Sequence, residues 1–186
     1  KICHAEDLET VKTMGFRGEA LASIAAISKF KLLTRHKDGA IASEVVVEGG
    51  KMRFAGDGAR EKGTTIEVKQ LFYNVPARRK FQKSPSTSTT QIVRKMTDLA
   101  LAHPGMQFEL WCDGKEKFKT SGQGFMQAAE ELLGKTYLEQ TVEIDTAHVK
   151  GVLGKPHACR STRSGQYLFV NERAVDCPLI CTAITE

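Results

Sequence analysis

GFRGEALASIAA, residues 15–26, places two glycines three positions apart in front of an alanine-rich run of helical composition. A glycine at such a place indicates a sharp turn, because glycine adopts backbone conformations that other residues avoid. The first turn of a helix also presents unpaired N–H groups and about half a positive charge, which favour a bound anion. The residues alone leave two interpretations open, a packed turn or a phosphate site at Gly15, Arg17 and Gly18.

The residues after this run change from helical to two-residue periodicity. We expect a helix over 19–27, with Glu19 as an acid of its first turn. Strands are predicted at 29–34, 42–48, 51–54 and 64–71, with glycine-rich turns at 49–50 and 56–58. In the last strand Ile66 and Val68 alternate with polar residues, which is typical of a sheet with one face in water. The pattern predicts an antiparallel sheet covered on one side by helices, and an α+β fold class.

A second region of helices and hairpins follows. Hydroxyl residues favour capping of a helix that starts near residue 84, stops at His103 and buries Ile92 and Leu99. Asp113-Gly114 indicates a two-residue hairpin turn. A helix at 125–133 and strands at 141–145, 148–153 and 166–170 are expected beyond it. The tetrapeptide SGQG at 121–124 has the composition of a linker, so we place a domain boundary there, between residues 1–121 and 122–186.

The chain carries a net charge of +5, and the positive excess lies in its first part. Residues 1–123 have a net charge of +7, whereas residues 124–186 have −2. The stretch between Glu67 and Asp98 contains no acid and seven cations, namely Lys69, Arg78, Arg79, Lys80, Lys83, Arg94 and Lys95. Such a stretch attracts phosphate, either of a nucleotide or of nucleic acid, while a solvated basic face is the plainer interpretation.

Side chains suited to other chemistry are scattered. The five cysteines include no CxxC pair, which indicates free thiols in a reducing compartment. The five histidines lack metal-ligand spacing, so we predict neither a metal site nor catalytic residues. No stretch approaches the ~20 apolar residues that a membrane span needs, and no membrane partner is expected.

Four stretches resemble, in the same order, the N-terminal region of the MutL family of DNA mismatch repair proteins, within the GHKL ATPase superfamily. They are GFRGEALASI at 15–24, GTTIEV at 63–68, LFYNVPARRKF at 71–81 and YLFVNERAVD at 167–176. The resemblance implies the C-terminal part of a GHKL ATPase α/β sandwich to about residue 121. The first part of a transducer domain like domain 2 of ribosomal protein S5 is then expected to follow.

The resemblance also implies a nucleotide site. The segment that matches the family's phosphate-wrapping lid consists of Gly15, Phe16, Arg17, Gly18, Glu19, Ala20 and Leu21. Thr64 is expected in the polar network that reads the adenine, although the residue type by itself is equally an ordinary strand former. In the NVPARRK segment the plain interpretation is a turn, in which Asn74 bonds its own backbone and Pro76 stiffens the chain.

Four basic residues are candidates for DNA contact. They are Arg78, Arg79 and Lys80 within NVPARRK, and Arg173 after the turn at Asn171. Glu172 stands where the family commonly has glycine, so a positive φ at this position costs about 1 kcal/mol unless the turn is of another type.

The function implied is that of an ATP-dependent switch, with Mg²⁺ as a second cofactor. The family's proteins form a homodimer when loaded with ATP and couple a mismatch recognition protein to a downstream repair nuclease or helicase on DNA. The family's catalytic glutamate, magnesium-binding asparagine, adenine-binding aspartate motif and γ-phosphate lysine have no counterpart in this chain. We therefore expect the fragment itself to bind no cofactor and to hydrolyse no ATP.

The NVPARRKF segment is closer to bacterial members of the family, which predicts a location in the bacterial cytoplasm. Two alternative functions stay open. One is a nucleic-acid-binding module without nucleotide chemistry, and the other is a different GHKL protein such as a type II topoisomerase or a chaperone.

Overall fold

The computed structural model describes residues 18–158 and 165–183. The chain divides into two compact units, Lys1–Lys83 and Ser84–Glu186. In the described part of the first unit the elements are α1 (Ala20–Ala26), β1 (Lys29–Arg35), β2 (Ala42–Glu48), β3 (Lys51–Gly58), β4 (Gly63–Lys69) and α2 (Pro76–Lys80). In that of the second unit they are α3 (Pro85–Ala102), β5 (Glu109–Cys112), β6 (Lys115–Lys119), α4 (Phe125–Leu133), α5 (Lys135–Glu139), β7 (Thr141–Asp145), β8 (Lys150–Gly154), η2 (Pro156–Ala158), β9 (Phe169–Val170), β10 (Arg173–Ala174) and α6 (Pro178–Ala183).

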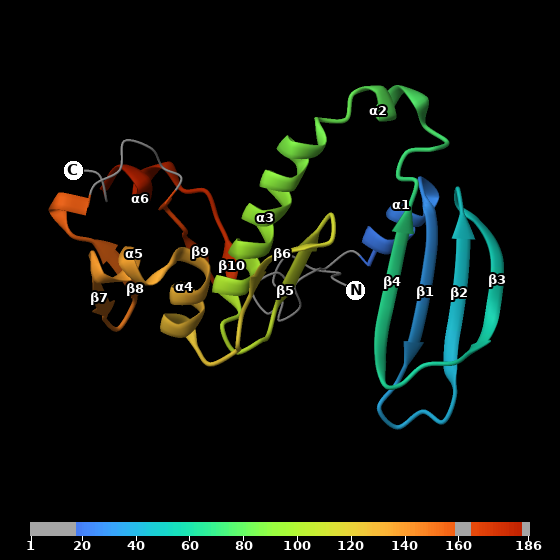
Figure 1. The fold of residues 1–186 in the computed structure, drawn as a ribbon, viewed down its shortest axis with the longest axis horizontal. Coiled ribbons are helices and arrows are strands. Elements are labelled where there is room, and N and C mark those ends of the chain that lie inside the picture. Colours follow the sequence, from blue (N-terminus) through green and yellow to red (C-terminus); the bar gives the residue numbers. More distant parts are fainter. Residues whose placement is uncertain (1–17, 159–164, 184–186) are drawn as a thin grey trace, which may run out of the picture. The chain divides into compact units, whose positions relative to one another are not determined.

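The first unit is built on one antiparallel sheet with strand order β3-β2-β1-β4 (Figure 1). The apolar positions of neighbouring strands share one face, because Phe30 lies opposite both Val47 and Val68 in the register. The helix α1 contacts β1 and β2 and lies at the end of the sheet where β1 begins. Phe30 of β1 and Ala42 of β2 are buried, whereas Ile66 and Val68 of β4 are 44% and 43% exposed, so the edge strand β4 is less covered than β1.

Two predicted boundaries in this sheet are wrong. The predicted turn at 56–58 continues the strand, because β3 pairs with β2 as far as Gly58. A Cβ at Gly58 would lie 2.5 Å from Leu33 Cδ1, so the glycine allows close side-chain packing within the sheet rather than a reversal. The predicted strand 64–71 ends at Lys69, and Gln70 adopts a positive φ of 51° immediately after it.

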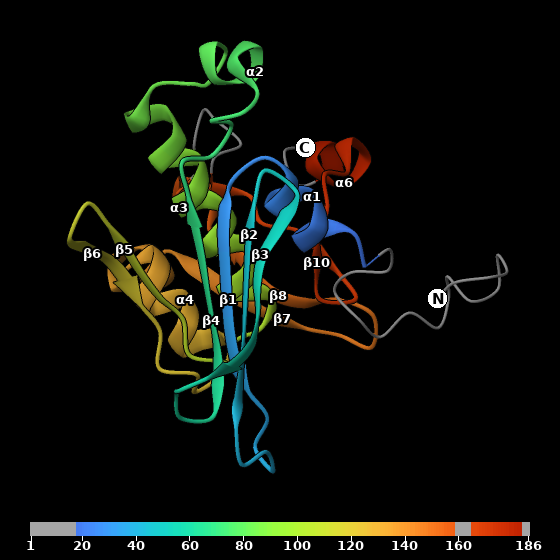
Figure 2. The same cartoon turned by 90° about the vertical axis from the view of Figure 1, so that its right-hand side faces the viewer.

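The long helix of the second unit begins as the sequence predicts. The Ser84 side chain caps α3 by accepting a hydrogen bond from the Thr87 N–H at 3.2 Å. The helix packs against α4, β5 and β10, and the hairpin β5–β6 lies beside α4 (Figure 2). Its buried residues are Thr97, Asp98, Ala100 and Leu101, whereas Ile92 is 50% exposed and its predicted burial is wrong.

The linker-like tetrapeptide at 121–124 lies inside the second unit. The Ser121 N–H donates to Glu131 Oε2 at 2.9 Å, and the Gln107 amide donates to the Ser121 carbonyl at 3.2 Å. The Gly124 N–H donates to the Pro104 carbonyl at 3.1 Å. These bonds join the segment to elements on both sides, and the contacts of the chain divide at 83/84 instead. The boundary after residue 121 stays a prediction about the family's domains.

Candidate functional site: a helix start, a threonine pair and a basic segment

The described part of the predicted phosphate segment begins at Gly18. Gly15, Phe16 and Arg17 lie outside the described residues. Gly18 has a φ of +67°, and no atom of the described residues lies within 4 Å of the position that a Cβ would occupy. The backbone at Gly18 is therefore in a conformation that favours glycine, and none of the described residues blocks approach to it.

The helix α1 starts one residue later than the sequence predicts. Glu19 is the N-cap residue rather than an acid of the first turn, because its carbonyl accepts the first helical hydrogen bond, from the Ser23 N–H at 2.9 Å. The Glu19 side chain makes no capping bond, so this helix start is not closed by its own N-cap. Ala20 and Leu21 follow in the first turn, with Leu21 44% exposed. The phosphate role of this segment stays a prediction.

Thr64 lies near the start of β4, directly opposite Thr34 of β1. Their hydroxyl oxygens are 2.7 Å apart, which is a good hydrogen-bond length for two hydroxyls. Thr34 is five residues along β1 from Lys29, about 17 Å at the usual rise of a strand. The predicted phosphate segment precedes β1 at one end, and the predicted adenine residue lies near the other. This arrangement suits an extended nucleotide laid along the strand.

The segment after β4 is anchored to the other end of α1. The Phe72 N–H donates to the Ile27 carbonyl at 2.7 Å, and the Asn74 side-chain amide donates to the Ala26 carbonyl at 3.0 Å. The expectation that Asn74 bonds its own backbone is therefore wrong. Its amide caps the C-terminus of a helix 48 residues earlier, where helical carbonyls have no partner of their own. Pro76 occupies the first turn of α2, where its missing N–H costs nothing.

Three candidate DNA-contacting residues make up the end of α2. Arg78, Arg79 and Lys80 are exposed, and none of them has an ion-pair partner among the residues that the structure describes. Lys83, three residues farther on, is likewise exposed and unpaired within that same set. The segment 78–83 therefore presents four uncompensated cations.

The other cations of the acid-free stretch have carboxylate partners. Lys69 Nζ lies 2.6 Å from Glu67 Oε2, and this hydrogen bond and charge lower the pKa of the Glu67 carboxyl. Arg94 and Lys95 each lie 3.3 Å from an Asp98 oxygen. The Arg94 guanidinium also sits over the Tyr167 ring, 3.7 Å from its centroid. These pairs leave the segment 78–83 as the uncompensated part of the stretch.

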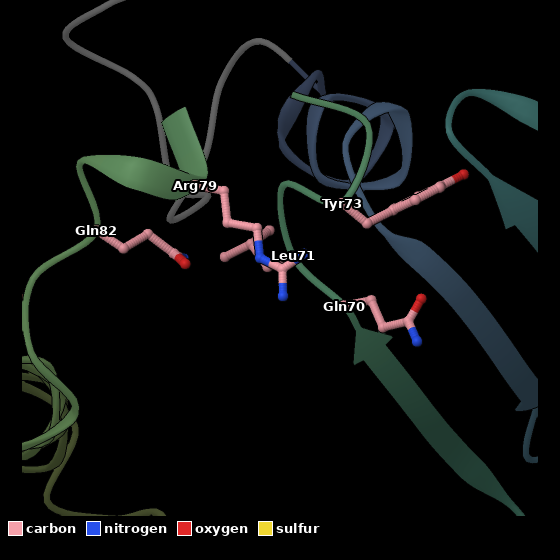
Figure 3. Close-up of a pocket in the computed structure, with 5 residues that line it drawn as sticks. All are labelled: Gln70, Leu71, Tyr73, Arg79 and Gln82. Atoms are coloured by element: carbon pink, nitrogen blue, oxygen red, sulfur yellow. The ribbon is translucent and has the colours of Figure 1, made fainter. Parts of the chain in front are cut away.

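A shallow hollow of about 380 Å³ lies between β4 and α2. Gln70, Leu71, Tyr73, Arg79 and Gln82 line it. Figure 3 shows the Arg79 side chain running beside Leu71, with the Gln82 side chain pointing toward these two, while the Tyr73 ring points away. A guanidinium and an amide at one hollow suit a phosphate oxygen, which accepts hydrogen bonds from both. Neither glutamine was identified from the sequence, and it is the turn after β4 that brings Gln70 to the same hollow as Gln82, which follows α2.

Arg173 lies on β10, opposite Val170 of β9. The two residues between these short strands, Asn171 and Glu172, have φ of 50° and 62°, which is the pattern of a type I′ hairpin turn. Glu172 thus adopts the positive φ that its glycine-like position requires, and its carboxylate lies 3.8 Å from His103 Nδ1. Arg173 belongs to the second unit, whereas α2 belongs to the first.

The described residues offer no other site chemistry. In ranges 18–158 and 165–183, no group of three or more histidines, cysteines or acids is arranged to hold a metal ion. Within the same ranges, no helix has the length and apolar character needed to cross a membrane.

Comparison with known proteins connects these features to one family. A family model for "DNA mismatch repair protein, C-terminal domain" matches residues 129–186. MutL of Symbiobacterium thermophilum is 42% identical over 180 residues, which is 94% of this chain. MutL of Christiangramia forsetii is 39% identical over 189 residues, covering the whole chain. The chain belongs to the MutL family of DNA mismatch repair proteins. It spans 28% and 31% of the length of these two MutL relatives.

Solved MutL structures have the same fold. The ATPase domain of Aquifex aeolicus MutL complexed with ADP matches with a TM-score of 0.77 at 28% identity, covering 98% of this chain and 70% of that one. A second structure of the ATPase domain of this Aquifex MutL, a bacterial mismatch repair endonuclease, has a TM-score of 0.71 at 27% identity, covering 99% and 68%. The predicted α+β fold of a MutL ATPase region is confirmed.

Proposed function

We propose that the full-length MutL protein with this segment is an ATP-dependent switch that couples mismatch recognition to downstream repair. In this proposal it binds ATP with Mg²⁺, hydrolyses ATP slowly, forms a homodimer when loaded, and acts on DNA with a mismatch recognition protein and a repair nuclease or helicase in the bacterial cytoplasm. The observation that carries the proposal is the match to a MutL ATPase domain complexed with ADP over 98% of the chain. MutL matches also favour this function over that of a topoisomerase or chaperone.

The geometry of the first unit supports a nucleotide site between Gly18 and Thr64. The start of α1 has no side-chain cap from Glu19, and no atom of the described residues lies within 4 Å of a Cβ position at Gly18. Backbone N–H groups there would donate to phosphate oxygens, and the Thr64 hydroxyl would contact the base. Mg²⁺, when bound with ATP, neutralises phosphate charge. No residue of this chain is assigned as a ligand of this Mg²⁺ ion.

The nucleotide site is tested with a valine at Gly18 in the full-length protein. A Cβ at Gly18 meets no atom of the described residues, so we expect Gly18→Val to cost mainly backbone strain in the absence of nucleotide. Gly114→Val is the matched control, because Gly114 has a φ of +71° and equally open surroundings in a hairpin turn of the second unit. We expect Gly18→Val to weaken ATP binding about 10- to 100-fold. This factor corresponds to the free energy of one lost hydrogen bond to a charged group.

Both variants should lose similar thermal stability, and only Gly18→Val should lose ATP affinity in calorimetric titrations. Equal ATP affinities in the two folded variants would show that Gly18 does not meet the nucleotide.

DNA contact is the second part of the proposal, and the unpaired cations at 78–83 support it. Side chains that contact phosphates without reading bases need an exposed positive group and no competing carboxylate. Arg78, Arg79 and Lys80 meet both conditions. We propose that they bind the DNA backbone, with Arg173 as a further candidate on the other unit.

A further inference from the structure

The hollow between β4 and α2 brings an uncharged side chain beside one of the candidate DNA-contacting residues. We infer that Gln82 donates a hydrogen bond to the same DNA phosphate group that Arg79 contacts. The inference rests on the proposed DNA contact by the cations of α2, to which it adds a residue without charge. Gln82 and Arg79 both line the hollow, and both belong to the first unit of the chain.

The backbone at the end of α2 places these two side chains together. The Gln82 N–H donates to the Arg79 carbonyl at 3.3 Å, which closes one tight helical turn after α2. Side chains three positions apart in such a turn lie on the same side. Figure 3 shows the Gln82 side chain pointing toward Arg79, whose side chain runs beside Leu71. Leu71 gives the apolar part of the arginine a surface to lie on and leaves the guanidinium for a ligand.

Both side chains have hydrogen-bond donors to offer. Arg79 and Gln82 are exposed, and neither side chain has a hydrogen-bond or ion-pair partner among the residues that the structure describes. A guanidinium carries five N–H donors and a glutamine amide carries two. The oxygens of a DNA phosphate carry no proton at neutral pH, so they only accept. The hollow thus presents a charged donor and a neutral donor to a ligand of this kind.

The charges around the hollow favour a chain of phosphates over a single anion. Arg78, Lys80 and Lys83 are exposed and have no ion-pair partner within the described residues. A single small anion would neutralise only part of this charge, whereas the regularly spaced phosphates of DNA can meet several cations. Gln82 lies inside this run of cations, so a strand bound by them passes close to its amide.

Salt dependence distinguishes a neutral donor from a cation. A cation that contacts a phosphate releases about one condensed counterion, which adds about 0.9 to the slope of log affinity against log salt. An amide releases none. Loss of the Gln82 amide should therefore weaken DNA binding by the same factor at every salt concentration. Loss of Arg79 should weaken binding and also lower the slope by about 0.9.

The experiment titrates a fluorescein-labelled duplex with the full-length protein at four or more salt concentrations, with melting temperatures in parallel. The variants are Gln82→Ala, Arg79→Ala and the double variant. Gln70→Ala is the matched control, because Gln70 borders the same hollow but Figure 3 shows its amide directed away from Arg79. Gln82→Leu, which keeps the length of the side chain and removes its donors, repeats the measurement if alanine lowers the melting temperature.

We expect Gln82→Ala to weaken binding about five- to tenfold with an unchanged slope, the factor that one hydrogen bond carries. Gln70→Ala should keep the wild-type affinity and slope. In the double variant, the Gln82 change should cost less than about twofold, because the phosphate is no longer held in the hollow once Arg79 is lost.

Three results overturn the inference while leaving DNA contact by the cations intact. One is wild-type affinity in Gln82→Ala. The second is a slope that Gln82→Ala lowers as much as Arg79→Ala does, which indicates that Gln82 acts only by holding the arginine. The third is an undiminished cost of Gln82→Ala in the Arg79→Ala background, which places the two residues on different phosphates. A slope that stays unchanged when the cations of α2 are removed overturns the proposed DNA contact, and this inference with it.

Discussion

The unpaired cations of α2 give a quantitative prediction for DNA binding. Each phosphate contact contributes about 0.9 to the slope of log affinity against log salt on duplex DNA. Replacing Arg78, Arg79 and Lys80 together by alanine should therefore lower the slope of the full-length protein by about 2.7, if each residue contacts one phosphate. Between 50 and 200 mM salt, the wild-type protein should then lose about 40-fold more DNA affinity than the triple variant.

The assay is a fluorescence anisotropy titration of duplexes of unrelated sequence at four or more salt concentrations. Lys69→Ala is the control, because the Lys69 ammonium is paired with Glu67 at 2.6 Å and should contribute no phosphate contact. The triple variant should weaken binding to all sequences alike, since these residues read no bases. An unchanged salt slope, accompanied by a lower melting temperature, would refute the reasoning and indicate that the three cations stabilise the fold.

Three further predictions concern the chain's stability, each measured by denaturant unfolding. Gly49→Ala should destabilise the protein by more than the roughly 1 kcal/mol cost of its positive φ, because a Cβ there would lie 2.7 Å from the Tyr73 hydroxyl. In a Tyr73→Phe background this excess should shrink, because the only close contact left is with Asn74 Nδ2 at 3.1 Å, and an equal cost in both backgrounds would contradict the contact with the hydroxyl. Glu172→Gly should stabilise the protein by about 1 kcal/mol, since Glu172 adopts a φ of 62° and its exposed carboxylate contributes little through the contact with His103; a loss of stability would contradict this. The Ser121 N–H bond, together with the Gln127 amide, lowers the pKa of Glu131 below 4.5, so this carboxylate stabilises the fold above that pH and loses its effect as the pH falls through the lowered value. Glu131→Gln should therefore lower stability at neutral pH and flatten the decline in acid, and an acid decline as steep as in wild type would contradict it.

The sequence predicted turns and helix starts correctly where a few neighbouring residues determine the local backbone. The Asp113-Gly114 hairpin has both residues at positive φ, and Ser84 caps α3, because each depends on residues within three positions. Asn74 was misassigned because its side chain can bond either its own backbone or a distant carbonyl. Only the fold decides between them, by bringing the end of α1 beside the turn after β4. The Thr34–Thr64 pair depends in the same way on the β1–β4 register, which strand periodicity does not determine.

The basic stretch shows which part of a charge pattern is readable from the sequence. A window without acids overstates the free positive charge, because carboxylates at its two edges reach into it. Glu67 is two positions from Lys69 along one face of a strand, and Asp98 is four from Arg94 on a helix, so both pairs follow from element periodicity. If the cations that have such a carboxylate partner are left out of the count, Arg78, Arg79, Lys80 and Lys83 remain. These are the same four cations that have no ion-pair partner among the described residues. Periodicity could not place Arg94 over Tyr167, 73 residues away, because that contact depends on the fold of the second unit. A search for phosphate-binding surfaces should therefore discount cations with a carboxylate at strand or helix spacing before it counts charge.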